Sequence, residues 1–128
     1  MGSRDDGART AAEELMLQGE IWSAHLNDPT GSEPGFSRPV MIVQGDRLNA
    51  SRLSTVVVVP LTTNLKWANV GGNVVLKVRP GLKKASVANV SQIVALDRSV
   101  LGRAVATATA AELQTVLLGI DFVLGREG

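Results

Sequence analysis

Short apolar runs, separated by polar segments rich in glycine and proline, recur along most of this chain. Runs of this kind that contain many β-branched residues are typical of strands. Residues 55–61 form a buried run of mostly valine, and residues 38–44 are apolar on both faces, which is typical of a central strand. The pattern predicts strands at residues 19–26, 38–44, 55–61, 73–78, 86–96 and 103–108.

Near the C-terminus the apolar residues change to the period of a helix. Residues 109–112 match a capping box, in which the threonine and the glutamate each satisfy a backbone N–H group of the other. Apolar residues behind it fall on one helix face, namely Leu113, Val116, Leu117, Ile120 and Leu124. They predict an amphipathic helix that ends near Gly125.

The order of these elements predicts the fold class. Many short strands with one terminal helix favour a mainly β fold with helices (α+β), in which a small twisted sheet or half-open barrel carries the helix on one face. Residues 47–54 are expected to contain one helical turn. Residues 10–13 match a second capping box, which predicts a short helix through Leu17. We expect residues 1–18 to be a flexible or short-helical tail and residues 19–128 to be the folded domain.

Composition narrows the possible functions. The chain has 128 residues and no cysteine, which excludes a disulfide framework and a cysteine-rich zinc site. His25 is the only histidine, so a metal site would rest mostly on carboxylates. No apolar run approaches the roughly 20 residues of a membrane span, and no signal peptide is recognisable, so a cytoplasmic location is expected. Residues 47–103 hold nine basic residues and one acid, which fits either a polyanionic partner or a plain solvated surface.

Two segments carry side chains suited to a phosphodiester. The loop GSEPGFSRPV offers the Ser32 hydroxyl, the Glu33 carboxylate and the permanent cation of Arg38. The strand TVVVVPLTTN ends in the neutral hydroxyls of Thr62 and Thr63. A guanidinium matches phosphate geometry with paired donors, and a hydroxyl can donate to a non-bridging oxygen. Together these groups can bind and polarise a phosphodiester without a metal.

Four pieces of sequence, in order, resemble the MazF/PemK family of toxin endoribonucleases: G-E-I-W, G-S-E-x-G-x-x-R-P-V, T-V-V-V-V-P-L-T-T-N and S-V-A-N-V-S-Q-I. The resemblance spans roughly residues 19–125. It implies an SH3-like half-open barrel of the CcdB/PemK type that forms a homodimer and needs no cofactor. The implied activity is sequence-specific, metal-independent cleavage of single-stranded RNA by attack of the 2′-OH, leaving a 2′,3′-cyclic phosphate and a 5′-OH. A MazE-like antitoxin is the implied protein partner.

The resemblance also implies roles for individual residues. Arg38 and Thr62 match the positions of the family's catalytic arginine and threonine, and Glu33 matches a glutamate that the family usually carries. We expect Glu33 to position the 2′-OH, to accept its proton or to pair with Arg38. The expected substrate-binding residues are Ser32, Thr63, Asn64, Ser86, Gln92 and His25. His25 and Ser91 stand where relatives often carry an acid.

Three other functions stay open on the sequence. CcdB-like relatives of the same fold poison DNA gyrase and cut nothing, although such a binder has no need of the Glu33, Arg38 and Thr62 set. The departures at His25 and Ser91 also allow an inactive small-barrel binding module. A carboxylate-metal nuclease would need Asp28, Glu33 and Asp46 to converge.

Overall fold

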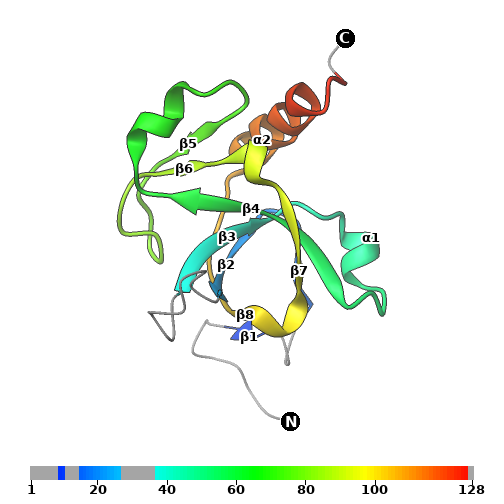
Figure 1. The fold of residues 1–128 in the computed structure, drawn as a ribbon. Helices are drawn as coiled ribbons and strands as arrows, with labels where there is room; N and C mark the ends of the chain where they lie inside the picture. The colour runs from blue at the N-terminus through cyan, green and yellow to red at the C-terminus, as the bar shows by residue number, and fades with distance from the viewer. Residues whose placement is uncertain (1–8, 11–14, 27–36, 127–128) are drawn as a thin grey trace.

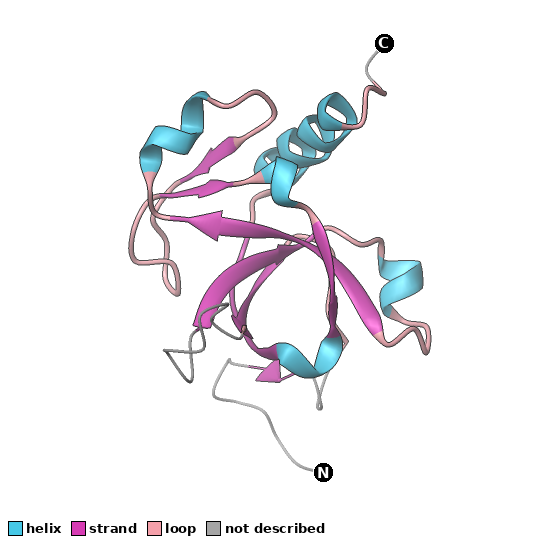
Figure 2. Ribbon diagram, in the orientation of Figure 1, coloured by secondary structure: helices cyan, strands magenta, loops and turns pink. Residues whose placement is uncertain are grey.

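The computed structural model describes residues 9–10, 15–26 and 37–126. The strands are β1 (Arg9–Thr10), β2 (Glu20–His25), β3 (Ser37–Ile42), β4 (Thr55–Thr62), β5 (Val74–Leu76), β6 (Ser86–Ala88), β7 (Val94–Asp97) and β8 (Leu101–Thr107). The helices are α1 (Asp46–Asn49) and α2 (Ala110–Val123), with 3-10 turns η1 (Leu65–Asn69), η2 (Val90–Gln92) and η3 (Arg98–Val100). Figure 2 shows that strands make up most of the body and that α2 is its longest helix.

The strands form a curled antiparallel sheet in which β4 is shared by two parts. The order is β1-β8-β2-β3-β4-β6-β5, and β7 also pairs with β4. The first residues of β4, 55–58, pair with β7, whereas Leu61 and Thr62 pair with β6. Strands β8, β2, β3, β4 and β7 therefore curl around one side of the molecule, and the β5–β6 hairpin stands out on the other (Figure 1). The predicted half-open barrel with a C-terminal helix is confirmed.

The inside of the curled sheet is filled by a cluster centred on Trp22, which is fully buried. Valines and isoleucine from alternate positions of β3 and β4 pack around it, because successive side chains of a strand point to opposite faces. The buried Glu20 carboxylate accepts hydrogen bonds from the Trp22 indole N–H (3.0 Å) and from the Leu17 backbone N–H (2.9 Å). Met16 joins the same cluster at 1% exposure.

A second cluster lies between the sheet and α2. Met41 and Leu61 belong to it, and Val116 is the buried residue that α2 contributes. The predicted capping box is confirmed: the Thr109 side chain accepts from the Glu112 N–H, and Glu112 accepts from the Thr109 N–H. Leu113, Leu117 and Ile120 pack against the cluster as expected. Leu124 does not, because the helix ends at Val123 and leaves it 60% exposed.

Close backbone contact holds α2 against the η1–β5 turn. A side chain at Gly119 would collide with the carbonyl oxygen of Gly72, and one at Gly71 would meet the ring of Phe122. The turn itself needs glycine at position 72, where φ is +88°. Small residues on both surfaces thus set the distance between the helix and the β5–β6 hairpin.

The predicted single strand over residues 86–96 is wrong. It is divided into β6, η2 and β7, because both strands pair with β4 but the chain between them is longer than the matching stretch of β4. The buried Val90 anchors this interruption. Its N–H donates to the Asn73 side chain (2.8 Å), and the Asn89 N–H donates to the Pro60 carbonyl (2.9 Å).

The predicted N-terminal helix is also absent from the part of it that the structure describes. Thr10 ends strand β1, which pairs with Arg103 and Ala104 of β8, and residues 15–17 are not helical. Residues 11–14 lie outside the described residues. At the described positions, backbone pairing with β8 and burial of Met16 outweigh the helical preference of the local sequence. The predicted single turn after β3 is confirmed as α1.

Candidate active site

The ends of β3 and β4 form a fork at one edge of the sheet. The two strands pair at Val40–Pro60, Met41–Val59 and Ile42–Val58. The pairing with β3 ends at Pro60, Leu61 and Thr62 pair with β6 on the other edge of β4, and the end of β4 lies apart from the beginning of β3 (Figure 1). The fork therefore separates residues 37–39 on one strand from residues 61–63 on the other.

Arg38 and Thr62 lie on the two sides of this fork. Arg38 is exposed near the beginning of β3 and lies opposite Ala24 of β2. Thr62 ends β4, where its Oγ1 accepts a hydrogen bond from the Asn64 N–H (3.2 Å). This bond uses a lone pair of the hydroxyl and leaves its hydrogen available to donate to a phosphate oxygen.

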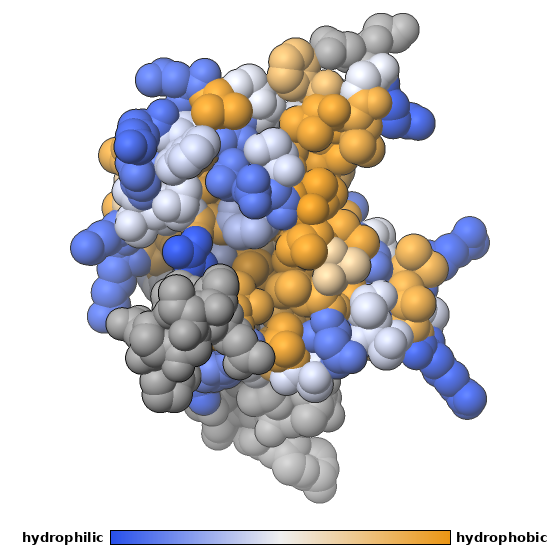
Figure 3. Space-filling view, viewed as in Figure 1, coloured by the Kyte–Doolittle hydropathy of each residue, from blue (hydrophilic) through white to orange (hydrophobic). Residues whose placement is uncertain are grey.

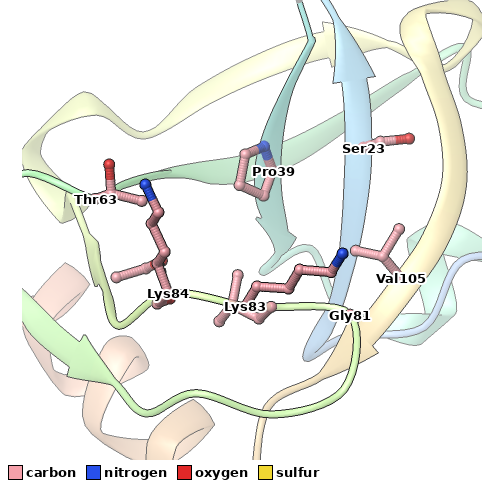
Figure 4. A pocket seen from close by; sticks show the side chains of 9 residues that line it. Ser23, Pro39, Thr63, Gly81, Lys83, Lys84 and Val105 are labelled. Atoms are coloured by element: carbon pink, nitrogen blue, oxygen red, sulfur yellow. The ribbon is translucent and has the colours of Figure 1, made fainter.

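A pocket of about 370 Å³ opens beside the fork. Pro39 and Thr63, the neighbours of Arg38 and Thr62 in sequence, both line it. Residues from β2, β8 and β6 complete its wall together with the segment that precedes β6, namely Ser23, Val105, Ser86, Gly81, Leu82, Lys83 and Lys84. None of these described lining residues is acidic, and their side chains offer apolar groups, hydroxyls and two ammonium groups. Figure 4 shows the Lys84 ammonium near Thr63 and the Lys83 ammonium toward Val105.

The segment that carries the two lysines is fixed by Arg79. Its guanidinium makes a bidentate ion pair with Glu112, with both N–O distances at 2.6 Å, and also donates to the Thr107 carbonyl (3.1 Å). Hydrogen bonding to Arg79 lowers the pKa of Glu112 to about 2, and the same bond raises the pKa of Arg79. The β5–β6 connection is thereby tied to both β8 and α2.

The structure brings some predicted site residues together and separates others. Thr63 and Ser86 line the pocket, although Ser86 is buried and its hydroxyl donates to the Lys84 carbonyl (3.0 Å). Asn64 caps η1, where its side chain accepts from the Lys66 N–H. His25 is exposed at the end of β2, opposite Ser37, and does not line the pocket.

Three further predicted residues lie away from the pocket or outside the described residues. Gln92 is exposed on η2 and does not line the pocket. Ser32 and Glu33 lie outside the described residues. The functions of all these residues stay predictions. Sequence reasoning did not single out Lys83 and Lys84, although an adjacent lysine pair after the Pro80-Gly81 turn was a usable signal.

Among the described residues, no three His, Cys, Asp or Glu side chains are grouped as metal ligands would be. Asp46, one of the acids considered for a metal site, accepts hydrogen bonds from the Gln18 N–H and the Asn49 side chain. Asp28 and Glu33, the other two, are not described. The described helices include none that is long and apolar enough to cross a membrane.

The fold is a small half-barrel. At the fork between β3 and β4 it presents the cations of Arg38, Lys83 and Lys84 and the hydroxyls of Thr62 and Thr63. Residues 17–124 match the family described as "PemK-like, MazF-like toxin of type II toxin-antitoxin system". The chain belongs to this family.

Named relatives agree with this assignment. Endoribonuclease MazF6 of Mycobacterium tuberculosis is 39% identical over 111 residues, which are 86% of this chain and 97% of the relative. Endoribonuclease MazF of Staphylococcus saprophyticus is 32% identical over 112 residues, 87% of this chain and 92% of the relative. A solved mycobacterial endoribonuclease in complex with its cognate antitoxin has a TM-score of 0.70 at 22% identity, covering 88% of this chain and 98% of that chain.

Proposed function

We propose that this protein is the toxin of a toxin–antitoxin pair and acts as a sequence-specific endoribonuclease on single-stranded RNA. The observation that carries the proposal is the 39% identity, over 86% of the chain, to relatives named endoribonucleases. The fork supports it, because Arg38 and Thr62 occupy its two sides and two lysines lie beside it.

The proposed reaction uses the RNA's own 2′-OH as nucleophile. The 2′ oxygen loses its proton and bonds to phosphorus, the P–O5′ bond breaks, and the departing 5′ oxygen takes up a proton. The products are a 2′,3′-cyclic phosphate and a 5′-OH. Arg38 stabilises the negative charge that develops on the phosphorane, and Thr62 donates to a non-bridging oxygen. Glu33 positions the 2′-OH. Arg38 acts as an electrostatic stabiliser in this scheme.

A homodimer and a MazE-like antitoxin complete the proposal. An apolar band runs over α2 and down across β7 (Figure 3). Exposed apolar residues on these elements include Leu118, Phe122 and Val94. Exposed apolar surface of this kind marks protein–protein contact sites. We propose that a second copy covers this band, that the antitoxin blocks the fork, and that the protein acts in the cytoplasm.

Gyrase binding without cleavage is the less favoured alternative. It would leave the Arg38 guanidinium and the Thr62 hydroxyl without a role. An inactive binding module would do the same. No feature of the described residues favours either alternative over the nuclease.

The test is cleavage of a long unstructured RNA by the purified protein in excess chelator. Arg38→Ala is the test variant, and Arg47→Ala, which removes an exposed arginine of α1, is the matched control. We expect discrete cuts with cyclic-phosphate and 5′-hydroxyl ends from wild type and control, and at least about 100-fold slower cutting by Arg38→Ala. Intact RNA with a folded wild-type protein would refute the proposal, and a supercoiling assay with gyrase would follow.

A further inference from the structure

The pocket beside the fork combines an apolar wall with two cations. Pro39, Leu82 and Val105 supply the wall. The ammonium groups of Lys83 and Lys84 point toward different ends of the pocket (Figure 4). At about 370 Å³ the pocket is at the small end of ligand sites, so it suits one compact group rather than a large ligand.

The lysine segment is held in place independently of any ligand. Gly81 has a φ of +88° and lies so close to the Val105 carbonyl that a side chain there would collide with it. Arg79 and Leu82 exchange backbone hydrogen bonds (3.1 and 2.8 Å), and Glu112 pairs with the Arg79 side chain. The backbone that carries Lys83 and Lys84 is therefore preorganised, which lowers the entropic cost of binding an anion there.

We propose that this pocket holds one nucleotide of the RNA next to the scissile phosphate, with its base against Pro39, Leu82 and Val105 and the phosphates on either side paired with Lys84 and Lys83. Lys84 lies at the Thr63 end, so its phosphate is the one nearer to Thr62. This inference rests on the proposed function and adds a substrate-binding site to it.

A nucleotide accounts for the whole composition of the pocket. A base has an apolar face that packs against carbon, and the phosphates on its two sides match two separated ammonium groups. A free phosphate or another small anion would leave the apolar wall unused. A purely apolar ligand would make no use of the two cations. Unpaired bases are also the parts of RNA that proteins read for sequence.

The two parts of the pocket should act on different properties of the enzyme. Lysine is a point charge, so Lys83 and Lys84 contribute affinity that does not depend on sequence. The wall contacts the base, so it contributes preference at one position of the recognition sequence. Neither part contacts the reacting atoms, so both should change KM and leave kcat nearly unchanged.

The test measures binding of a non-cleavable oligonucleotide, with a 2′-deoxy residue at the cut site, over a range of salt concentrations. The variants are Lys83→Ala, Lys84→Ala and the double substitution. Lys77→Ala is the matched control, since Lys77 is an exposed lysine of the same connection that does not line the pocket. Each lysine that contacts a phosphate contributes about 0.7 to the slope of log K against log salt for a single strand. If variant and wild type bind equally at 1 M salt, removing one such lysine weakens binding about fourfold at 150 mM. Removing both lysines weakens it about fifteenfold.

We expect Lys77→Ala to match wild type and the double variant to lose about 1.4 in slope. A charge-preserving Lys84→Arg variant should retain most of the affinity. Val105→Phe, which fills the pocket, should change the preferred base at one position of mapped cut sites, with circular dichroism confirming that the variant is folded. If the Val105→Phe variant folds but keeps the base preference of wild type at every position, the base does not lie against this wall, and that part of the proposal is overturned.

Failure of this inference differs from failure of the proposed function. If wild type cuts and binds RNA while the double variant keeps the slope and affinity of Lys77→Ala, the pocket is not a nucleotide site and the nuclease proposal stands. A wild-type protein that neither binds nor cuts RNA would overturn both.

Discussion

The ion pair between Arg79 and Glu112 joins the lysine-bearing connection to the first turn of α2, so breaking it should destabilise the fold measurably. Glu112→Gln removes the charge but keeps an amide oxygen that can still accept from the Thr109 N–H. The substitution therefore isolates the ion pair from the helix cap.

The expected magnitude follows from the pKa of Glu112, which falls from an ordinary value of 4.5 to about 2. Each tenfold change in proton affinity is worth about 1.4 kcal/mol, so the charged form is favoured by about 3 kcal/mol. The two side chains are 15% and 16% exposed, and solvent screens part of the interaction. We expect a loss of about 2 kcal/mol in the free energy of unfolding at pH 7.

The pH dependence has a definite sign. Because folding lowers the pKa of Glu112, the ion pair stabilises the protein fully above the unfolded pKa, near 4.5, and this stabilisation is lost as the pH falls toward 2. Urea unfolding at fixed protein concentration should therefore show a large difference between wild type and Glu112→Gln at pH 7 and a much smaller one at pH 2.5.

A matched control is available on the same helix. Asp121→Asn breaks the pair with Arg126, whose side chains are 41% and 71% exposed, and should cost less than about 0.5 kcal/mol. A cost of Glu112→Gln no larger than that of this control at pH 7 would contradict the assigned strength of the ion pair. A difference between wild type and Glu112→Gln that stays constant from pH 7 to pH 2.5 would contradict it as well.

Three further predictions concern close packing and can be checked by urea unfolding, with RNA binding added for the third. Gly119→Ala should destabilise by about 1–3 kcal/mol, because contact with the Gly72 carbonyl outweighs the gain of about 1 kcal/mol in helix propensity. A stabilised variant would show that α2 can move away. Met16→Ala should cost about 2–5 kcal/mol, since Met16 is buried beside Trp22, and no loss would place it outside the core. Gly81→Ala should weaken RNA binding more than Lys77→Ala does, and equal affinities would contradict the role of this turn.

The sequence predicted the elements whose signals are local. Capping at Thr109 and Glu112 depends on residues three apart, and the central position of β3 follows from apolar residues on both of its faces. The division of residues 86–96 could not be predicted in this way. It depends on how β6 and β7 share one edge of β4, and on an Asn73 side chain that reaches Val90 from the residue just before β5.

The candidate site shows the same limit. The positions of Arg38 and Thr62 at strand ends could be predicted from the resemblance and the strand pattern. The pocket could not, because its wall combines residues from four strands and from the β5–β6 connection. The connection itself is positioned by Arg79, whose partner Glu112 is 33 residues away and had been assigned only a role in helix capping.

The central claim is that Arg38 and Thr62, on the two sides of the fork, act on the same phosphate. A double-mutant cycle with Arg38→Ala and Thr62→Val, read out as single-turnover cleavage of a short RNA, tests it most directly. If both side chains stabilise one transition state, their losses are not independent, and the double variant should cut within about tenfold of Arg38→Ala alone. Losses that multiply, or an Arg38→Ala variant that cuts as fast as wild type, would contradict the account.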